Sequence, residues 1–176
     1  YSASKVIGEA KTFNKTGDRL YFLRLWTQSH QRSEDAGTVI EYALKQVIQN
    51  VDYAHDAGLL RGLAEPLPYL ESEEEIRKLV DIFDQQKQSS LLVEELVRLE
   101  ILLARAEARF DIETADDRLI SLYFELQEVD DLATRTEGWA RLLAALPLAD
   151  PLTSEEESIL EEVSDDLERS TSDLLS

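Results

Sequence analysis

Apolar residues recur at spacings of three and four along almost the whole chain, and few residues interrupt the pattern. This spacing places side chains on one face of an α-helix, and the 176 residues contain only six glycines and four prolines to break it. No stretch alternates apolar and polar residues as a half-buried strand does. The sequence therefore predicts an all-α protein. The clearest case is residues 92–110, where the apolar stripe consists of Leu92, Leu96, Leu99, Leu103 and Ala106.

About nine helices are expected, and local chemistry explains where several of them begin or end. The prolines of EPLPYL (65–70) cannot continue a helix, because proline lacks the amide hydrogen and clashes with the preceding turn. Ser72 with Glu75 is typical of a capping box, in which two side chains bind free amide groups at a helix start. Ser154 with Glu157 repeats that pattern. The expected helices cover residues 2–13, 17–30, 34–50, 53–63, 72–87, 90–110, 114–128, 131–146 and 154–170.

Pairs of large apolar residues recur at an interval of about 40 residues, and this interval indicates a repeat. The pairs begin at Leu20, Leu60, Leu99 and Trp139. Sixteen positions after each of the first three pairs, a second set of apolar residues begins, at Ala36, Ile76 and Ala115. Such an interval favours helical hairpins that stack on one another.

The spacing resembles that of tetratricopeptide-type repeats, in which a large-x-x-large pair on one helix is followed by small and large residues on the next. ARLLAALPLADP (140–151) is also similar to the end of such a repeat. Arg24 and Leu103 stand where that family favours a small residue at the helix crossing. Thr27 and Ala106 stand where it favours tyrosine, and a period near 40 approaches HEAT-like lengths.

The resemblance implies stacked antiparallel hairpins over residues 1–151 and a groove that binds other proteins without chemistry of its own. Residues 152–176 are acidic, with a thin stripe at Ile159, Val163 and Leu167, and are expected to form a capping helix and tail. A non-repeating helical bundle is the alternative fold. A regulatory or dimerisation bundle of a larger enzyme or sensor is the corresponding alternative function.

The net charge of −19, from 37 acidic and 18 basic residues, restricts the partners. Such a surface repels nucleic acids and anionic membranes, so we expect a partner protein or peptide that is basic or apolar. No apolar run reaches the roughly 20 residues of a membrane span, and no signal-peptide pattern opens the chain. A cytoplasmic location is expected on these grounds. The chain begins at Tyr1 and contains no methionine, which indicates a fragment of a longer protein.

RLWTQSH (24–30) is the one stretch with the outline of an active site. An arginine a few residues before a histidine resembles the signature of HEPN-type helical ribonucleases, in which Arg24 would hold a phosphate and His30 would transfer protons. The alternative is an ordinary helix with both side chains partly solvated and with His30 near its negative end. The acidic charge and the absence of a basic patch favour the ordinary helix, so we expect no enzyme and no catalytic residue.

Metal and cofactor chemistry find little support in the sequence. DYAHD (52–56) places Asp52, His55 and Asp56 close together, but a two-metal bundle requires a second such motif, and only one other histidine exists. The chain has no cysteine, no glycine-rich phosphate loop and no Gly-x-Ser-x-Gly. We therefore expect no metal site and no cofactor.

The candidate contact residues are aromatic and arginine side chains. Tyrosine and tryptophan contribute much of the binding energy at protein interfaces, although each is also a common core residue. Three arginines near one face of the 90–110 helix would bind a partner's carboxylate, unless they pair with Glu94 and Glu113. The candidates are Tyr21, Trp26, Tyr42, Arg98, Arg105 and Arg109.

Overall fold

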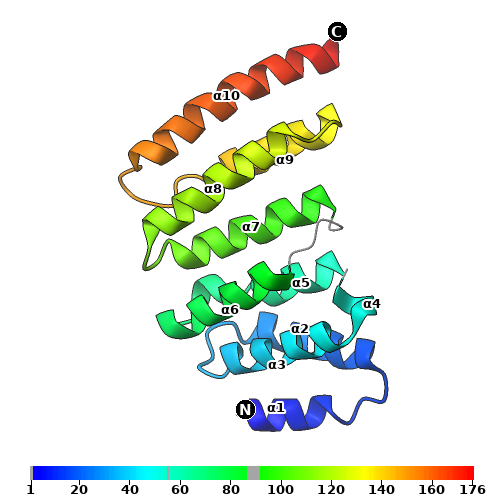
Figure 1. Ribbon diagram of the computed structural model, residues 1–176. Helices are drawn as coiled ribbons and strands as arrows, with labels where there is room; N and C mark the ends of the chain where they lie inside the picture. Colours follow the sequence, from blue (N-terminus) through cyan, green and yellow to red (C-terminus); the bar gives the residue numbers. More distant parts are fainter. Residues whose placement is uncertain (1, 55, 87–91) are drawn as a thin grey trace. The chain divides into compact units, whose positions relative to one another are not determined.

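The computed structural model describes residues 2–54, 56–86 and 92–176 (Figure 1). All regular secondary structure in these residues is helical. Within them lie ten α-helices and one 3₁₀ helix, and no strand. The all-α prediction is confirmed. The chain divides into two compact units, Tyr1–Leu92 (unit 1) and Val93–Ser176 (unit 2).

Unit 1 is a layered set of short helices in which α2 and α3 form the central hairpin. The hairpin contacts α1 on one side, α2 also contacts α5, and α3 also contacts α4, α5 and α6 (Figure 1). Its core is mostly aliphatic but includes an aromatic ring, with Leu20, Leu23, Ile40, Leu60 and Phe83 almost completely buried. The helices are α1 (Ala3–Ala10), α2 (Thr16–Ser29), α3 (Ala36–Gln49), α4 (Val51–Ala54), α5 (Ala57–Ala64), η1 (Leu67–Tyr69) and α6 (Glu73–Gln86).

The expected single helix over 53–63 is wrong, because the chain forms α4 and α5 there instead. The Asp56 carboxylate accepts a hydrogen bond from the Leu59 amide (2.9 Å) and so caps a new helix start. The proline segment 65–70 ends α5 and continues as the short η1, as proline chemistry requires. Ser72 Oγ accepts from the Glu75 amide (3.2 Å), which is half of the capping box expected there.

Two glycines in unit 1 allow close approach between helices. A Cβ on Gly62 of α5 would overlap the side chain of Arg24 on α2, and a Cβ on Gly37 of α3 would overlap the carboxyl group of Glu75 on α6. The absence of a side chain at Gly62 therefore leaves room on α5 for the Arg24 side chain of α2.

Unit 2 consists of two helical hairpins, α7 with α8 and α9 with α10 (Figure 1). α9 contacts both α7 and α8, and α10 packs against α8 as well as α9. The shared core is rich in leucine and contains Trp139 and Tyr123. Leu92 is 73% exposed, so the stripe expected to begin there starts later in the helix. The bounds are α7 (Val93–Glu107), α8 (Ile112–Gln127), α9 (Leu132–Ala145) and α10 (Ser154–Leu175).

The last helix begins with a capping box one residue before the expected one. Thr153 Oγ1 accepts from the Glu156 amide (3.1 Å), and Glu156 accepts from the Thr153 amide (3.1 Å), so the predicted pairing of Ser154 with Glu157 is wrong. The helix also continues to Leu175, beyond the expected end at residue 170.

Helices separated by the 40-residue interval lie side by side within each unit. α2 contacts α5 and α3 contacts α6 in unit 1, and α7 contacts α9 in unit 2. These are the neighbours that stacked hairpins require. The solenoid over residues 1–151 and the boundary at residue 151 stay predictions.

Candidate partner-binding surfaces

The outer side of α2 presents an aromatic and an aliphatic residue one turn apart. Tyr21 is 55% exposed and Leu25 is 42% exposed. The Arg24 guanidinium lies 5.0 Å from the centre of the Tyr21 ring, a cation–π contact. Because the stem of Arg24 is packed against Gly62, the tyrosine ring rests on a neighbour that is itself held in place. This pair of residues, Tyr21 and Leu25, is the α2 surface.

The other two aromatic candidates are less accessible. Trp26 is 9% exposed and stacks on His30, with ring centres 4.6 Å apart. It therefore belongs to the core, which was the alternative to partner contact for this residue. Tyr42 on α3 is half-buried, and the Lys11 ammonium lies 5.9 Å from its ring centre. Among the three, Tyr21 is the one with more than half of its surface free.

Arg24 and His30 contact different neighbours. His30 follows the last residue of α2, and its Nδ1 forms a 2.9 Å hydrogen bond with the Trp26 carbonyl oxygen. Arg24 is engaged by Tyr21 and Gly62. His55 of the DYAHD stretch lies outside the described residues. Within the described part of the chain, no group of three or more His, Cys, Asp or Glu side chains is placed to hold a metal ion.

Unit 1 also has a small pocket of about 220 Å³ where the loop after α2 meets the start of α6. Its charged residues are mostly acidic, and Tyr69 adds a 45% exposed ring. Burial raises the pKa of the Glu75 carboxyl, and the nearby Glu41 carboxylate raises it further, while Lys78 lowers it. This pocket therefore suits a basic group. It is lined by Arg32, Ser33, Glu34, Tyr69, Leu70, Glu71, Ser72 and Glu75.

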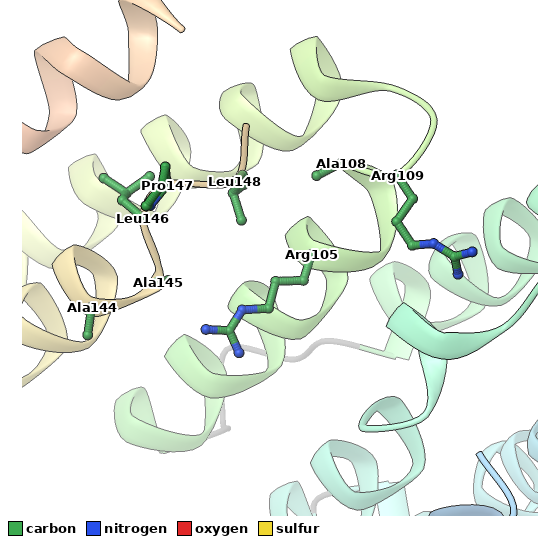
Figure 2. Close-up of a pocket in the computed structure, with 8 residues that line it drawn as sticks. All are labelled: Arg105, Ala108, Arg109, Ala144, Ala145, Leu146, Pro147 and Leu148. Carbon is green, nitrogen blue, oxygen red and sulfur yellow. The ribbon is translucent and has the colours of Figure 1, made fainter. Parts of the chain in front are cut away.

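Unit 2 has a larger pocket, of about 520 Å³, between the C-terminal part of α7 and the segment that follows α9 (Figure 2). Arg105 comes from α7 and Arg109 from the turn that follows it, and the residues of the opposite wall are apolar. Figure 2 shows the Arg105 side chain extending along α7 and the Arg109 guanidinium directed away from it. The lining consists of Arg105, Ala108, Arg109, Ala144, Ala145, Leu146, Pro147 and Leu148.

The three candidate arginines, two on α7 and Arg109 just after it, have different surroundings. Arg98 donates to Glu94 (2.7 Å), the ion pair expected as the alternative to partner binding, and it is not part of the pocket lining. Arg105 is exposed and makes no hydrogen bond or ion pair within the described residues. Arg109 is also exposed.

The apolar wall of this pocket is fixed by a buried carboxylate. Glu156 is fully buried at the first turn of α10, and its Oε1 accepts from the amides of Leu148 and Ala149. Its Oε2 accepts from the Thr153 amide. Three hydrogen bonds to one carboxylate thus tie the backbone at Leu148, Ala149 and Thr153 to the first turn of α10. We refer to the pocket with this wall as the unit 2 pocket.

A second buried carboxyl group lies beside Glu156. Asp116 of α8 accepts a hydrogen bond from Thr153 Oγ1 (2.7 Å), and its other oxygen has no partner within the described residues. Burial raises the pKa of Asp116, and the charges of Glu156, Glu155 and Asp117 raise it further, while the Thr153 hydrogen bond opposes them. The start of α10 thus concentrates negative charge behind the wall of the pocket.

The sequence reasoning missed the buried ion network of unit 2. Arg118 of α8 donates to Glu100 (2.8 Å) and makes two hydrogen bonds to Glu107 (both 2.7 Å), and all three side chains are almost buried. A signal was present, because Glu100 and Glu107 are seven residues apart and fall on the same helix face as the buried Val97 and Ala104.

No family model matches the chain, and no curated protein or solved structure is similar enough to match it. Among the described residues, no helix is both long enough and apolar enough to cross a membrane.

Proposed function

We propose that this chain is a non-catalytic protein-binding module, whose partner is a protein or peptide that is basic or apolar overall. The α2 surface is the observation that carries the proposal. An exposed tyrosine beside an exposed leucine, with the ring held against Arg24, offers contact area at a small cost in conformational entropy.

The charge distribution supports a basic or apolar partner. The chain carries 37 acidic residues, so an acidic partner meets repulsion during approach while a basic one is attracted. The pocket of unit 1 adds a local reason, because burial and the nearby Glu41 carboxylate raise the pKa of Glu75. A basic group bound there would relieve that electrostatic cost.

Peptide selection on the full chain tests the proposal. A phage-displayed library of random peptides is selected against the wild-type chain, and the Kd of each recovered peptide is measured by fluorescence anisotropy. We expect peptides enriched in Lys, Arg and apolar residues. Tyr21→Ala and Leu25→Ala should each weaken them about tenfold, as loss of a central contact does. Both variants should melt within about 3 °C of the wild type, because the side chains are exposed.

Ile48→Ala is the matched control, since Ile48 is 45% exposed but lies on α3. It should change the Kd by less than about twofold, as expected for a residue outside the contact. Failure to enrich any peptide, or enrichment of acidic peptides alone, would refute the proposal. A large fall in melting temperature for Tyr21→Ala would instead show that this residue is structural.

A further inference from the structure

Arg105 stands out in unit 2 because the acidic residues around it in α7 are already bound. Glu94 accepts from Arg98 and lies near Arg141, while Glu100 and Glu107 accept from Arg118. Arg105 is exposed and has no ion pair or hydrogen bond within the described residues. In a chain of net charge −19, it is an uncompensated cation at the edge of a pocket.

Apart from its two arginines, the unit 2 pocket is lined by apolar residues. Its opposite wall includes Leu146, Pro147 and Leu148 (Figure 2). The buried Glu156 accepts a hydrogen bond from the Leu148 amide. Ala108 and Ala144 add small side chains that leave room. A volume of about 520 Å³ falls within the usual range of ligand sites and accommodates more than one side chain.

We infer that the unit 2 pocket binds an aspartate or glutamate side chain together with an apolar side chain next to it in a partner peptide. The carboxylate pairs with the Arg105 guanidinium, whose planar donors match two carboxylate oxygens. The apolar neighbour packs on Leu146 and Leu148. The inference rests on the proposed function and names one element of the partner.

The charge of the whole chain limits what else the peptide carries. A run of acidic residues would meet repulsion from the remaining surface, and a phosphate group would bring more negative charge than one carboxylate. The carboxylate that reaches Arg105 therefore belongs to a segment whose other residues are basic or uncharged. This agrees with the partner expected for the α2 surface.

Synthetic peptides and the full chain provide the test. The probe is a peptide with Leu-Glu at its centre, Lys at both ends, an acetyl group and a C-terminal amide, and its Kd is measured by fluorescence anisotropy. Three comparison peptides replace Glu with Gln, replace Leu with Ala, or carry Gln with a free C-terminal carboxylate. We expect the Leu-Glu peptide to bind about tenfold more tightly than the Leu-Gln peptide.

Arg105→Gln should weaken the Leu-Glu peptide about tenfold and abolish the preference for Glu over Gln. The matched control is Arg169→Gln, which removes the same charge from an exposed site on α10. It should change the Kd by less than about twofold, because only the long-range field differs. Since Arg105 is exposed, its variant should keep the helical circular dichroism spectrum.

Three results would overturn the inference: no binding of the Leu-Glu peptide, equal binding of Leu-Glu and Leu-Gln, or tightest binding by the free terminal carboxylate. Equal weakening by Arg105→Gln and Arg169→Gln would do the same. Tyr21→Ala should leave this peptide's Kd unchanged. If the chain binds the phage-selected peptides but not the Leu-Glu peptide, the proposed function therefore stands and only the assignment of the unit 2 pocket is wrong.

Discussion

Unit 1 buries one polar side chain among the described residues, Thr27, whereas unit 2 buries five. Those five include the carboxyl groups of Glu100, Glu107, Asp116 and Glu156. Both units pack helices through the same neighbour relations, α2 with α5 and α7 with α9. These shared neighbour relations do not explain the difference in buried polar groups, which lies in the chemistry between the helices.

Apolar contacts between helices tolerate variation, whereas a buried charge must keep its partner. In unit 1 the ion pairs lie at the surface, as between Arg77 and Glu73, where both side chains are about half exposed. Such pairs contribute little, because water solvates the charges equally well. In unit 2 the loss of one partner leaves the others buried without compensation. We expect the stability of unit 2 to depend on a few named residues, and that of unit 1 on the sum of many.

The two tryptophans allow the units to be followed separately, because Trp26 lies in unit 1 and Trp139 in unit 2. Fluorescence of the Trp139→Phe chain reports on unit 1, and that of the Trp26→Phe chain reports on unit 2. Each substitution below is compared with its own single-tryptophan background.

The largest effect is expected from Arg118→Met. It leaves Glu100 and Glu107 buried without their common cation, so the free energy of unfolding of unit 2 should fall by about 3–5 kcal/mol in urea titrations. The matched control in unit 1 is Arg77→Met, which should cost about 0–1 kcal/mol. A triple variant with methionine at all three network positions should recover most of the loss. If Arg118→Met costs no more than Arg77→Met, the proposed contrast between the units is wrong.

A smaller effect is expected from Tyr123→Phe, which removes a buried hydroxyl of unit 2. Tyr123 donates to Asp166 (2.7 Å) and accepts from Gln127 (2.8 Å), linking α8 to α10. The substitution should lower the free energy of unfolding of unit 2 by about 1.5 kcal/mol at neutral pH, as for a hydrogen bond to a charged group. In unit 1, Tyr42→Phe should change it by less than about 0.5 kcal/mol.

The pH dependence provides a second measure of the same contact. Burial, together with the hydrogen bond to the Asp166 carboxylate, raises the pKa of Tyr123 from 10.0 to about 12. Because the folded pKa exceeds the unfolded one, the stabilisation is complete below pH 10 and is lost as the pH rises from 10 to about 12. Wild-type unit 2 should therefore lose stability more steeply over this window than Tyr123→Phe does. Identical slopes would show that the hydroxyl is not held as described.

The sequence predicted the apolar side of this contrast and missed the polar side. The three- and four-residue spacing located most helices, and the 40-residue interval identified α2 and α5 as neighbours, since apolar positions record which faces are buried. The presence of a charged residue does not indicate that its helix face is buried, so there was no reason in the sequence to separate Arg118 from the surface arginines. Only its position among Ala115, Leu119 and Leu122 distinguishes it.

The same limit applied to the surfaces and caps. Arg105 and Arg98 are nearly equivalent on a helical wheel. The spacing allowed the pairing of Arg98 with Glu94, but only the structure shows that Arg105, which has no ion pair within the described residues, lies at the pocket. The capping box was placed one residue late because Ser154 and Thr153 are both good caps. Helix-capping propensity alone does not distinguish Thr153 from Ser154, because the choice depends on the hydrogen bond that Glu156 accepts from Leu148, outside its own helix.

The smallest effect is expected from Gly62→Ala. This substitution tests whether the stability of unit 1 depends on close approach between helices, as that of unit 2 is expected to depend on buried charges. The new methyl group would overlap the stem of Arg24, and overpacking costs about 1–3 kcal/mol, while alanine in place of glycine gains about 1 kcal/mol of helix propensity. The free energy of unfolding of unit 1 should therefore fall by about 1 kcal/mol. In an Arg24→Ala background the overlap with Arg24 is absent and only the end of the flexible Gln28 side chain, 3.3 Å away, stays close. The same change should then raise the free energy of unfolding by up to about 1 kcal/mol. Gly8→Ala is the control, because nothing lies within 4 Å of its Cβ position, and it should stabilise unit 1.

If Gly62→Ala stabilises unit 1 as Gly8→Ala does, the Arg24 side chain moves aside freely. Arg24 would then not hold the Tyr21 ring in place, and the argument for a rigid α2 surface would fail.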